Sequence, residues 1–221
     1  MTFNWFQKKV DKNNYPDFWK EYESNFLNTE KLKLDKVRFV VFDTETTGFS
    51  KKNDRILSIG AISLTGNIIR VNDSFEIYVE QEIFTPETVK IHGILKKGDI
   101  EKVDELEAIK QFLKYIKNAV LVAHHVGFDV GMMNQMLERH NLPKLKNTAL
   151  DTGELHKKSK HEVYQNNLKQ YTLDELCDEL NISKSDRHTA SGDALITAIA
   201  FLKILSRLNK KNDLELKDLI K

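Results

Sequence analysis

The alternation of apolar and polar positions predicts an ordered series of strands and helices through the middle of the chain. A compact apolar run at 37–43 is typical of a buried strand. Two further strands, 56–64 and 68–79, are joined by the three residues 65–67, a turn short enough to force an antiparallel hairpin. The same criteria predict a helix at 103–117, a strand at 119–123, a helix at 129–140, a strand at 148–152, a helix after Thr172, where Glu175 completes a capping box, and a helix at 190–208.

The order of these elements predicts the fold class. Strands and helices alternate after an initial hairpin, which is typical of an α/β protein with a mixed five-stranded sheet flanked by helices. Residues 37–208 form the expected main domain, and residues 209–221 a short polar tail. The lysine-rich segment from 139 to 169 has few periodic signals, so we expect a long loop there.

The first 36 residues form an expected N-terminal extension that is rich in aromatic side chains. Phe18, Tyr22 and Phe26 recur at helical spacing after Pro16, which predicts a short amphipathic helix. We expect it to pack on the main domain, because exposed aromatic clusters need covering. Docking to a DNA polymerase or to a clamp is the alternative.

Composition bears on the cellular compartment of the protein but does not identify a binding partner. Lys and Arg number 34 against 33 Asp and Glu, so net charge does not indicate nucleic-acid binding. The single cysteine, Cys177, excludes an internal disulfide and a cysteine-built zinc site. The chain has no apolar run that would span a membrane and no signal-peptide pattern at its start, so we expect a cytoplasmic protein without a membrane partner.

Four carboxylates fall at the ends of predicted elements. Asp43 and Glu45 close the first strand in DTETTG and, two residues apart, point to the same face. Asp129 follows the fourth strand, and Asp193 lies five residues after His188 near the start of the last helix, on a face of small residues. Each is weak evidence alone, but the predicted topology brings them to one edge of the sheet. Hard oxygen donors without thiolates suit Mg²⁺ or Mn²⁺, and a carboxylate cluster holding two such ions is the recurrent apparatus of phosphodiester cleavage.

Three ordered motifs give the chain a family resemblance. They are DTETTG at 43–48, AHHVGFD at 123–129 and HTASGD at 188–193. The segments TPETVKIHGI at 85–94 and YTLDELCDELNI at 171–182 also follow the family pattern. With these motifs, residues 37–208 resemble the DEDDh family of 3′→5′ exonucleases, which has a ribonuclease-H-like fold, and are most similar to proofreading epsilon subunits of bacterial DNA polymerase III.

The resemblance implies a mechanism. Asp43, Glu45 and Asp193 would hold one Mg²⁺ or Mn²⁺ ion, Asp43 would bridge to a second, Asp129 would support the second ion, and His188 would act as the general base. Thr46, Thr47, Gly48, Phe49, His92 and Phe128 would cradle the terminal nucleotide of a single-stranded or frayed DNA 3′ end. The expected product is a nucleoside monophosphate.

Some polar residues near these motifs have simpler explanations. His125 stands where the family commonly has Asn; it could contact substrate, but we interpret it as a polar strand-end residue. His124 is ambiguous between the same two roles. Asp151 is explained by a strand that leads into a helix, and Cys177 by packing on its helix. Six lysines near the expected entrance could contact phosphates or simply be solvated: Lys144, Lys146, Lys157, Lys158, Lys160 and Lys169.

The sequence leaves the biological role open among several alternatives. A DNA exonuclease in proofreading or repair fits best, as a polymerase subunit or as a stand-alone enzyme. An exoribonuclease is the second candidate, and an inactive subunit that binds nucleic-acid ends is the third. The sugar preference depends on contacts to the 2′-hydroxyl, which sequence does not display.

Overall fold

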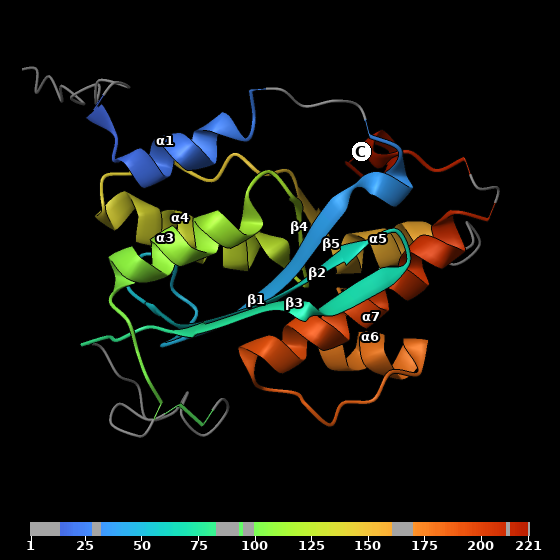
Figure 1. Cartoon of the computed structure of the whole chain (residues 1–221). Helices are drawn as coiled ribbons and strands as arrows, with labels where there is room; N and C mark the ends of the chain where they lie inside the picture. The colour runs from blue at the N-terminus through green and yellow to red at the C-terminus, as the bar shows by residue number, and fades with distance from the viewer. Residues whose placement is uncertain are drawn as a thin grey trace, which may run out of the picture.

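A mixed five-stranded sheet forms the centre of the molecule (Figure 1). The computed structural model describes residues 14–27, 32–82, 93–94, 100–160, 170–210 and 213–220. The strands are β1 (Arg38–Thr46), β2 (Ile56–Thr65), β3 (Ile68–Tyr78), β4 (Val120–Ala123) and β5 (Ala149–Asp151). Their order is β3-β2-β1-β4-β5, with β2 antiparallel to both of its neighbours and β4 parallel to β1 and β5. The predicted fold class and the predicted hairpin are confirmed.

Helices cover both faces of this sheet, so the hydrophobic core has two halves. One half lies under α1 (Asp17–Ser24), α3 (Glu105–Ile116) and α4 (Val126–Arg139). The other lies under α5 (Thr152–Ser159), α6 (Leu173–Leu180), α7 (Ala190–Leu208) and α8 (Leu216–Ile220). A short 3₁₀ turn, η2 (Leu34–Lys36), precedes β1. Figure 1 shows α3 and α4 on one side of the strands and α6 and α7 on the other.

Strand β1 sends alternate side chains into the two halves of the core. Val40 and Phe42 pack in the half under α3 and α4, whereas Phe39 and Val41 pack in the half under α7. Because side chains alternate along a strand, the odd positions that follow Val41 also face α7. Asp43 and Glu45 are therefore presented to α7, and Thr44 is presented to α4.

Three element boundaries predicted from the sequence were wrong. Strand β1 continues to Thr46, so the first motif begins inside the strand. Helix α3 begins at Glu105 rather than 103, because Val103 pairs with Val79 and the Asp104 side chain caps the helix. Helix α4 begins at 126 rather than 129.

The predicted fifth strand is present as β5, but the long loop predicted for the rest of 139–169 was wrong, because α5 follows this strand. The Asp151 carboxylate accepts hydrogen bonds from the backbone N–H groups of Gly153 and Glu154, which caps the start of α5. Leu155 and His156 are among the buried residues of this helix. Residues 161–169 lie outside the described residues.

Helix α1 is attached to the main domain through aromatic and polar contacts. Trp19 is fully buried and Tyr22 nearly so, whereas Phe18 and Phe26 are only partly buried. The Tyr22 hydroxyl donates to Asn147 Oδ1 over 2.6 Å and accepts from the N–H of Lys146. The predicted helix is confirmed, but its most buried residue, Trp19, lies outside the predicted aromatic repeat.

Candidate metal centre and active site

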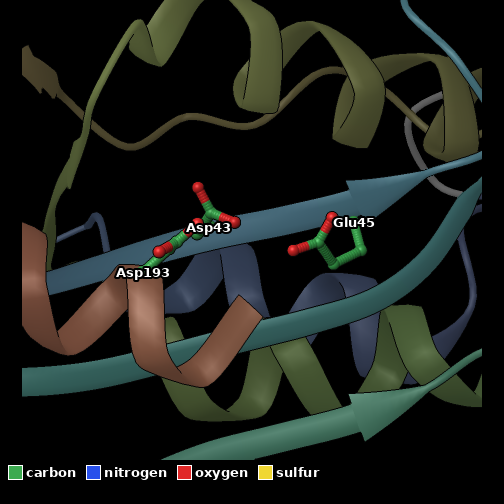
Figure 2. Close-up of side chains that lie close together, drawn as sticks. All are labelled: Asp43, Glu45 and Asp193. Carbon is green, nitrogen blue, oxygen red and sulfur yellow. The ribbon is translucent and has the colours of Figure 1, made fainter. Parts of the chain in front are cut away.

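Three carboxylates from two elements come together at one side of the sheet (Figure 2). Asp43 and Glu45 lie on β1, and Asp193 lies in the first turn of α7. One carboxylate oxygen from each lies within 4.8 Å of the others, which is close enough for one metal ion to contact all three. The structure therefore brings together three of the predicted ligands.

Two glycines allow close backbone approaches at the start of α7, one with the sheet and one with the turn that precedes the helix. Gly60 is the β2 partner of Asp43, and a Cβ at position 60 would overlap the α7 backbone at Ala190 and Ser191. Gly192 is in the first turn of α7, where a Cβ would overlap the carbonyl oxygen of Asp186. The small-residue face of α7 was predicted, but neither glycine was, because each is needed only when the folded backbone brings another segment close to it.

The fourth carboxylate, Asp129, reaches the site from the opposite face of β1. Its Oδ1 accepts hydrogen bonds from Thr44 Oγ1 at 2.7 Å and from the Thr44 N–H at 3.1 Å. The side chain is buried, and it lines the same pocket as the other three acids. Thr44, which sequence analysis did not single out, thus ties Asp129 on α4 to the middle of the acidic strand.

Burial and mutual repulsion make the carboxyl groups of this site difficult to ionise. Burial, followed by repulsion from Asp129, Asp193 and Glu45, raises the pKa of Asp43 well above its usual range. Burial also raises the pKa of Glu45 to about 7, with Asp193 adding to the shift. The pKa of Asp129 is likewise raised to about 7, mainly by burial. A bound cation would attract the ionised carboxylates and so lower each of these pKa values.

The chemistry of these side chains fits a divalent metal ion. All the donors are carboxylate oxygens, which Mg²⁺ and Mn²⁺ prefer. In addition, Asp193 Oδ1 is buried and has no hydrogen-bond partner within the described part of the chain. A buried carboxylate oxygen without a partner is costly, and a cation would satisfy it. Asp43, Glu45 and Asp193 could therefore hold a metal ion.

The raised pKa of Glu45 gives a first prediction about stability. A carboxyl group whose pKa is higher in the folded state stabilises the fold below its unfolded pKa, and this contribution is lost as pH rises through about 7. In chelator we therefore expect Glu45→Gln and the parent to be equally stable near pH 4.5, and the variant to be more stable by about 1–3 kcal/mol near pH 8. Denaturant unfolding across this range measures the difference.

Saturating Mn²⁺ should reverse the order at about pH 8, because the parent then gains binding energy that the variant lacks. Comparing the two proteins at each pH cancels the contributions of other titrating groups. A parent that is more stable than Glu45→Gln in chelator at the higher pH would contradict the argument.

His188 lies at the edge of the pocket that these acids line. The pocket has a volume of about 360 Å³ and also includes His124, His125, Phe49 and Phe128 in its wall. The His188 side chain is exposed, and its backbone is left-handed, with a φ of 68°. The next residue, Thr189, caps α7 by accepting from the N–H of Gly192. The turn between α6 and α7 thus presents an accessible imidazole beside the carboxylates.

The loop after β1 carries the aromatic residue predicted to contact a nucleotide. Phe49 is 86% exposed, and its ring lies 6.1 Å from that of Phe128, centroid to centroid. The Asp54 carboxylate closes the loop, because it accepts from Thr47 Oγ1 and from the N–H of Ser50 over 2.8 Å each.

Three other predicted nucleotide contacts lie here, Thr46 at the end of β1 and Thr47 and Gly48 in this loop, and a fourth cannot be placed. Gly48 packs against the Asp54 side chain with no room for a Cβ. The Thr46 hydroxyl donates to the Gly48 carbonyl over 2.8 Å. His92 lies outside the described residues.

The neighbouring polar residues have structural partners. His124 is buried between Thr152 Oγ1 and the Tyr171 carbonyl, and burial lowers its pKa to about 4. His125 begins α4 in a left-handed conformation, with Gln170 Nε2 at 3.2 Å from its Nδ1. The interpretation of Asp151 as a residue between a strand and a helix is confirmed, because it caps α5 and also accepts from the N–H of Val126.

The other structural predictions concern Cys177, a cap and the lysines. Cys177 is buried in the core, and the predicted capping box at Thr172 is present. Three of the described lysines among the six lie in ion pairs on the surface: Lys146 pairs with Glu23, Lys157 with Glu154 and Lys160 with Glu179. These pairs favour a structural role for the three, and Lys169 lies outside the described residues.

Comparison with known proteins is consistent with this geometry. A family model described as Exonuclease, RNase_T, matches residues 40–201. The chain belongs to the RNase_T exonuclease family. The match spans all three motifs, so the predicted resemblance to exonucleases is confirmed.

Among curated proteins, this exonuclease resembles two kinds of DNA polymerase III component. It is 38% identical over 175 residues to a DNA polymerase III PolC-type protein of Caldanaerobacter subterraneus subsp. tengcongensis. The aligned region covers 78% of this chain but only 12% of that protein. It is 33% identical over 180 residues to the DNA polymerase III subunit epsilon of Buchnera aphidicola subsp. Acyrthosiphon pisum, which covers 76% of this chain and 73% of that subunit. The chain thus corresponds to about an eighth of the PolC-type relative.

Solved structures of other nucleases share the fold. Escherichia coli exonuclease I in complex with a dT13 oligonucleotide has a TM-score of 0.67 at 16% identity, over 80% of this chain and 43% of that one. Cell-death related nuclease 4 has a TM-score of 0.66 at 14% identity, over 78% of this chain and 64% of that one. Within the described residues, no helix is long and apolar enough to cross a membrane.

Proposed function

We propose that this exonuclease removes nucleotides one at a time from the 3′ ends of DNA, with two divalent metal ions and His188 as the general base. The observation that carries the proposal is the convergence of Asp43, Glu45 and Asp193 within 4.8 Å beside an exposed histidine. Asp129, fixed by Thr44, adds a fourth acid to the same pocket. When bound, the metal ions would supply an activated water and charge stabilisation for the departing oxygen.

Proton transfer and nucleotide binding fall to other residues of the chain. His188 accepts the proton of the attacking water, a role suited to an imidazole near neutral pH. Phe49 and Phe128 offer aromatic faces on which an unpaired base can stack without its sequence being read. By the family resemblance, we also assign Thr46, Thr47, Gly48 and His92 to the terminal nucleotide.

DNA is the favoured substrate because of the relatives. Both curated relatives described above are named as DNA polymerase III components, and exonuclease I was solved with a DNA oligonucleotide. A role in proofreading or repair follows, with a polymerase or clamp as the partner to test. An exoribonuclease remains the second candidate, because the pocket geometry does not fix the sugar preference.

A digestion experiment tests this proposal. We expect a 5′-labelled single-stranded DNA to shorten stepwise from its 3′ end in Mg²⁺ or Mn²⁺ and to stay intact in chelator. A mismatched duplex end should be shortened faster than a paired one, because its terminal bases are frayed. The matched variant Asp193→Asn should show no digestion.

Three outcomes would contradict specific parts of the proposal. Faster shortening of a matched RNA would replace DNA as the substrate. Activity that survives complete chelation would remove the metal ions from the mechanism. Products released from the 5′ end would reverse the polarity.

A further inference from the structure

Arg187 connects two helices at the acidic site through one guanidinium group. Its Nε donates to Asp174 Oδ1 in the first turn of α6 over 2.8 Å. Its Nη1 donates to Asp193 Oδ2 in the first turn of α7. The Arg187 side chain is 15% exposed and that of Asp193 9%, so their ion pair is largely shielded from water, whereas Asp174 is 50% exposed. The guanidinium thus joins α6 to a predicted metal ligand.

The contact with Arg187 makes the two oxygens of Asp193 different. Oδ2 is bonded to the guanidinium, whereas Oδ1 is buried and has no hydrogen-bond partner in the part of the chain that the structure describes. With Oδ2 held, rotation of the carboxylate is restricted, and Oδ1 remains available for a cation. The carboxylate is therefore oriented before any metal ion binds.

The same side chain also lies in the turn that carries the predicted general base. Arg187 directly precedes His188, whose left-handed backbone sets the direction of the imidazole. Anchoring Arg187 to Asp174 and Asp193 fixes this turn at both neighbouring helices. One residue thereby determines the positions of both Asp193 and His188.

We propose that Arg187 is a positioning residue of the metal site, with Asp174 as its anchor. This inference rests on the proposed function, because it concerns the same metal ligands. Arginine is suited to the task because its rigid fork can donate to two carboxylates at once, whereas the single ammonium of lysine is a point charge on a flexible stem. The important property is therefore geometry rather than charge.

The variant Arg187→Lys separates these two properties, because it keeps the charge and loses the fork. We expect its affinity for Mn²⁺, measured by calorimetry without DNA, to fall about tenfold, the scale on which groups that orient metal ligands act. Turnover should fall at saturating DNA with little change in KM. Asp174→Asn, which weakens the anchor but leaves Arg187 in place, should shift both quantities in the same direction by less.

Arg139→Lys is the matched control. Arg139 makes a similar two-point ion pair with Glu105, at 2.6 and 3.0 Å, and does not line the acidic pocket. We expect this control to lower Tm as Arg187→Lys does but to leave Mn²⁺ affinity and turnover at parental values. A purely structural role for Arg187 predicts that the two variants behave alike.

The outcomes separate this inference from the proposed function. Parental or tighter Mn²⁺ binding by Arg187→Lys would overturn the positioning role, because the charge alone would then suffice or would compete with the metal. A parental protein that binds no Mn²⁺ would overturn the proposed metal mechanism itself. Weakened Mn²⁺ binding by Arg187→Lys alone, beside a normal Arg139→Lys, supports the inference.

Discussion

Replacing His188 with Asn should lower turnover by roughly 10²–10⁴-fold, the usual contribution of a general base. The amide cannot accept the proton of the attacking water, so the chemical step loses its base. The His188 side chain is exposed, so stability should stay close to the parental value. Initial rates on a labelled single-stranded oligonucleotide at saturating concentration measure the effect.

The choice of Asn follows from the backbone at this position. His188 has a φ of 68°, a left-handed conformation that Asn tolerates better than Ala. His188→Ala would add backbone strain to the loss of the imidazole, so it serves as the second variant. If both variants lose turnover equally per folded molecule, the imidazole and not the turn is responsible.

Two further measurements decide between binding and chemistry for His188. The affinity for Mn²⁺, and the affinity for DNA measured separately in chelator, should match the parent in both variants. His188 is not among the proposed metal ligands. His140→Ala is the control, since His140 lies beside Glu105, 3.4 Å from its carboxylate, and does not line the pocket. Parental turnover in His188→Asn would show that another group removes the proton.

The sequence predicted which acids meet at this site better than it predicted the residues that support them. The acids at 43, 45 and 193 and the small-residue face of α7 follow from periodicity and motif, because alternation along a strand is a local property. Arg187 and Asp174 were missed because they are 13 residues apart and meet only when the turn between α6 and α7 folds. No local pattern indicates a contact of that kind.

The placement of Asp129 illustrates the same limit. The motifs predicted that it would join the other acids, but not that it would approach from the opposite face of β1 through Thr44. Likewise, a helix after Asp151 was expected but its extent was not predicted, because Leu155 is an isolated apolar position within a lysine-rich stretch. Apolar periodicity predicts long elements well, whereas short helices depend on caps and on tertiary burial.

Gly60→Ala should damage both stability and turnover, although the change adds only one methyl group. The added Cβ would overlap the α7 backbone at Ala190 and Ser191, so the helix must move away from β2. We expect a loss of about 1–3 kcal/mol in unfolding free energy, as for overpacking elsewhere in protein cores. Denaturant unfolding in chelator measures this part without contribution from bound metal.

The same displacement should act on the chemistry, because Gly60 is the strand partner of Asp43 and α7 carries Asp193. Moving one carboxylate by about 1 Å relative to another can cost on the order of 10²-fold in rate. We therefore expect turnover per folded molecule to fall by at least about tenfold, with weaker Mn²⁺ binding.

Gly127→Ala is the matched control, because a Cβ at position 127 would have no neighbour within 4 Å. Residue 127 lies in the first turn of α4, where Ala is at least as favourable as Gly, so this variant should keep parental stability and turnover. Parental Mn²⁺ affinity and turnover in a destabilised Gly60→Ala would restrict the glycine to a packing role. Loss of all three properties together would show that the close approach of α7 to β2 builds the metal site.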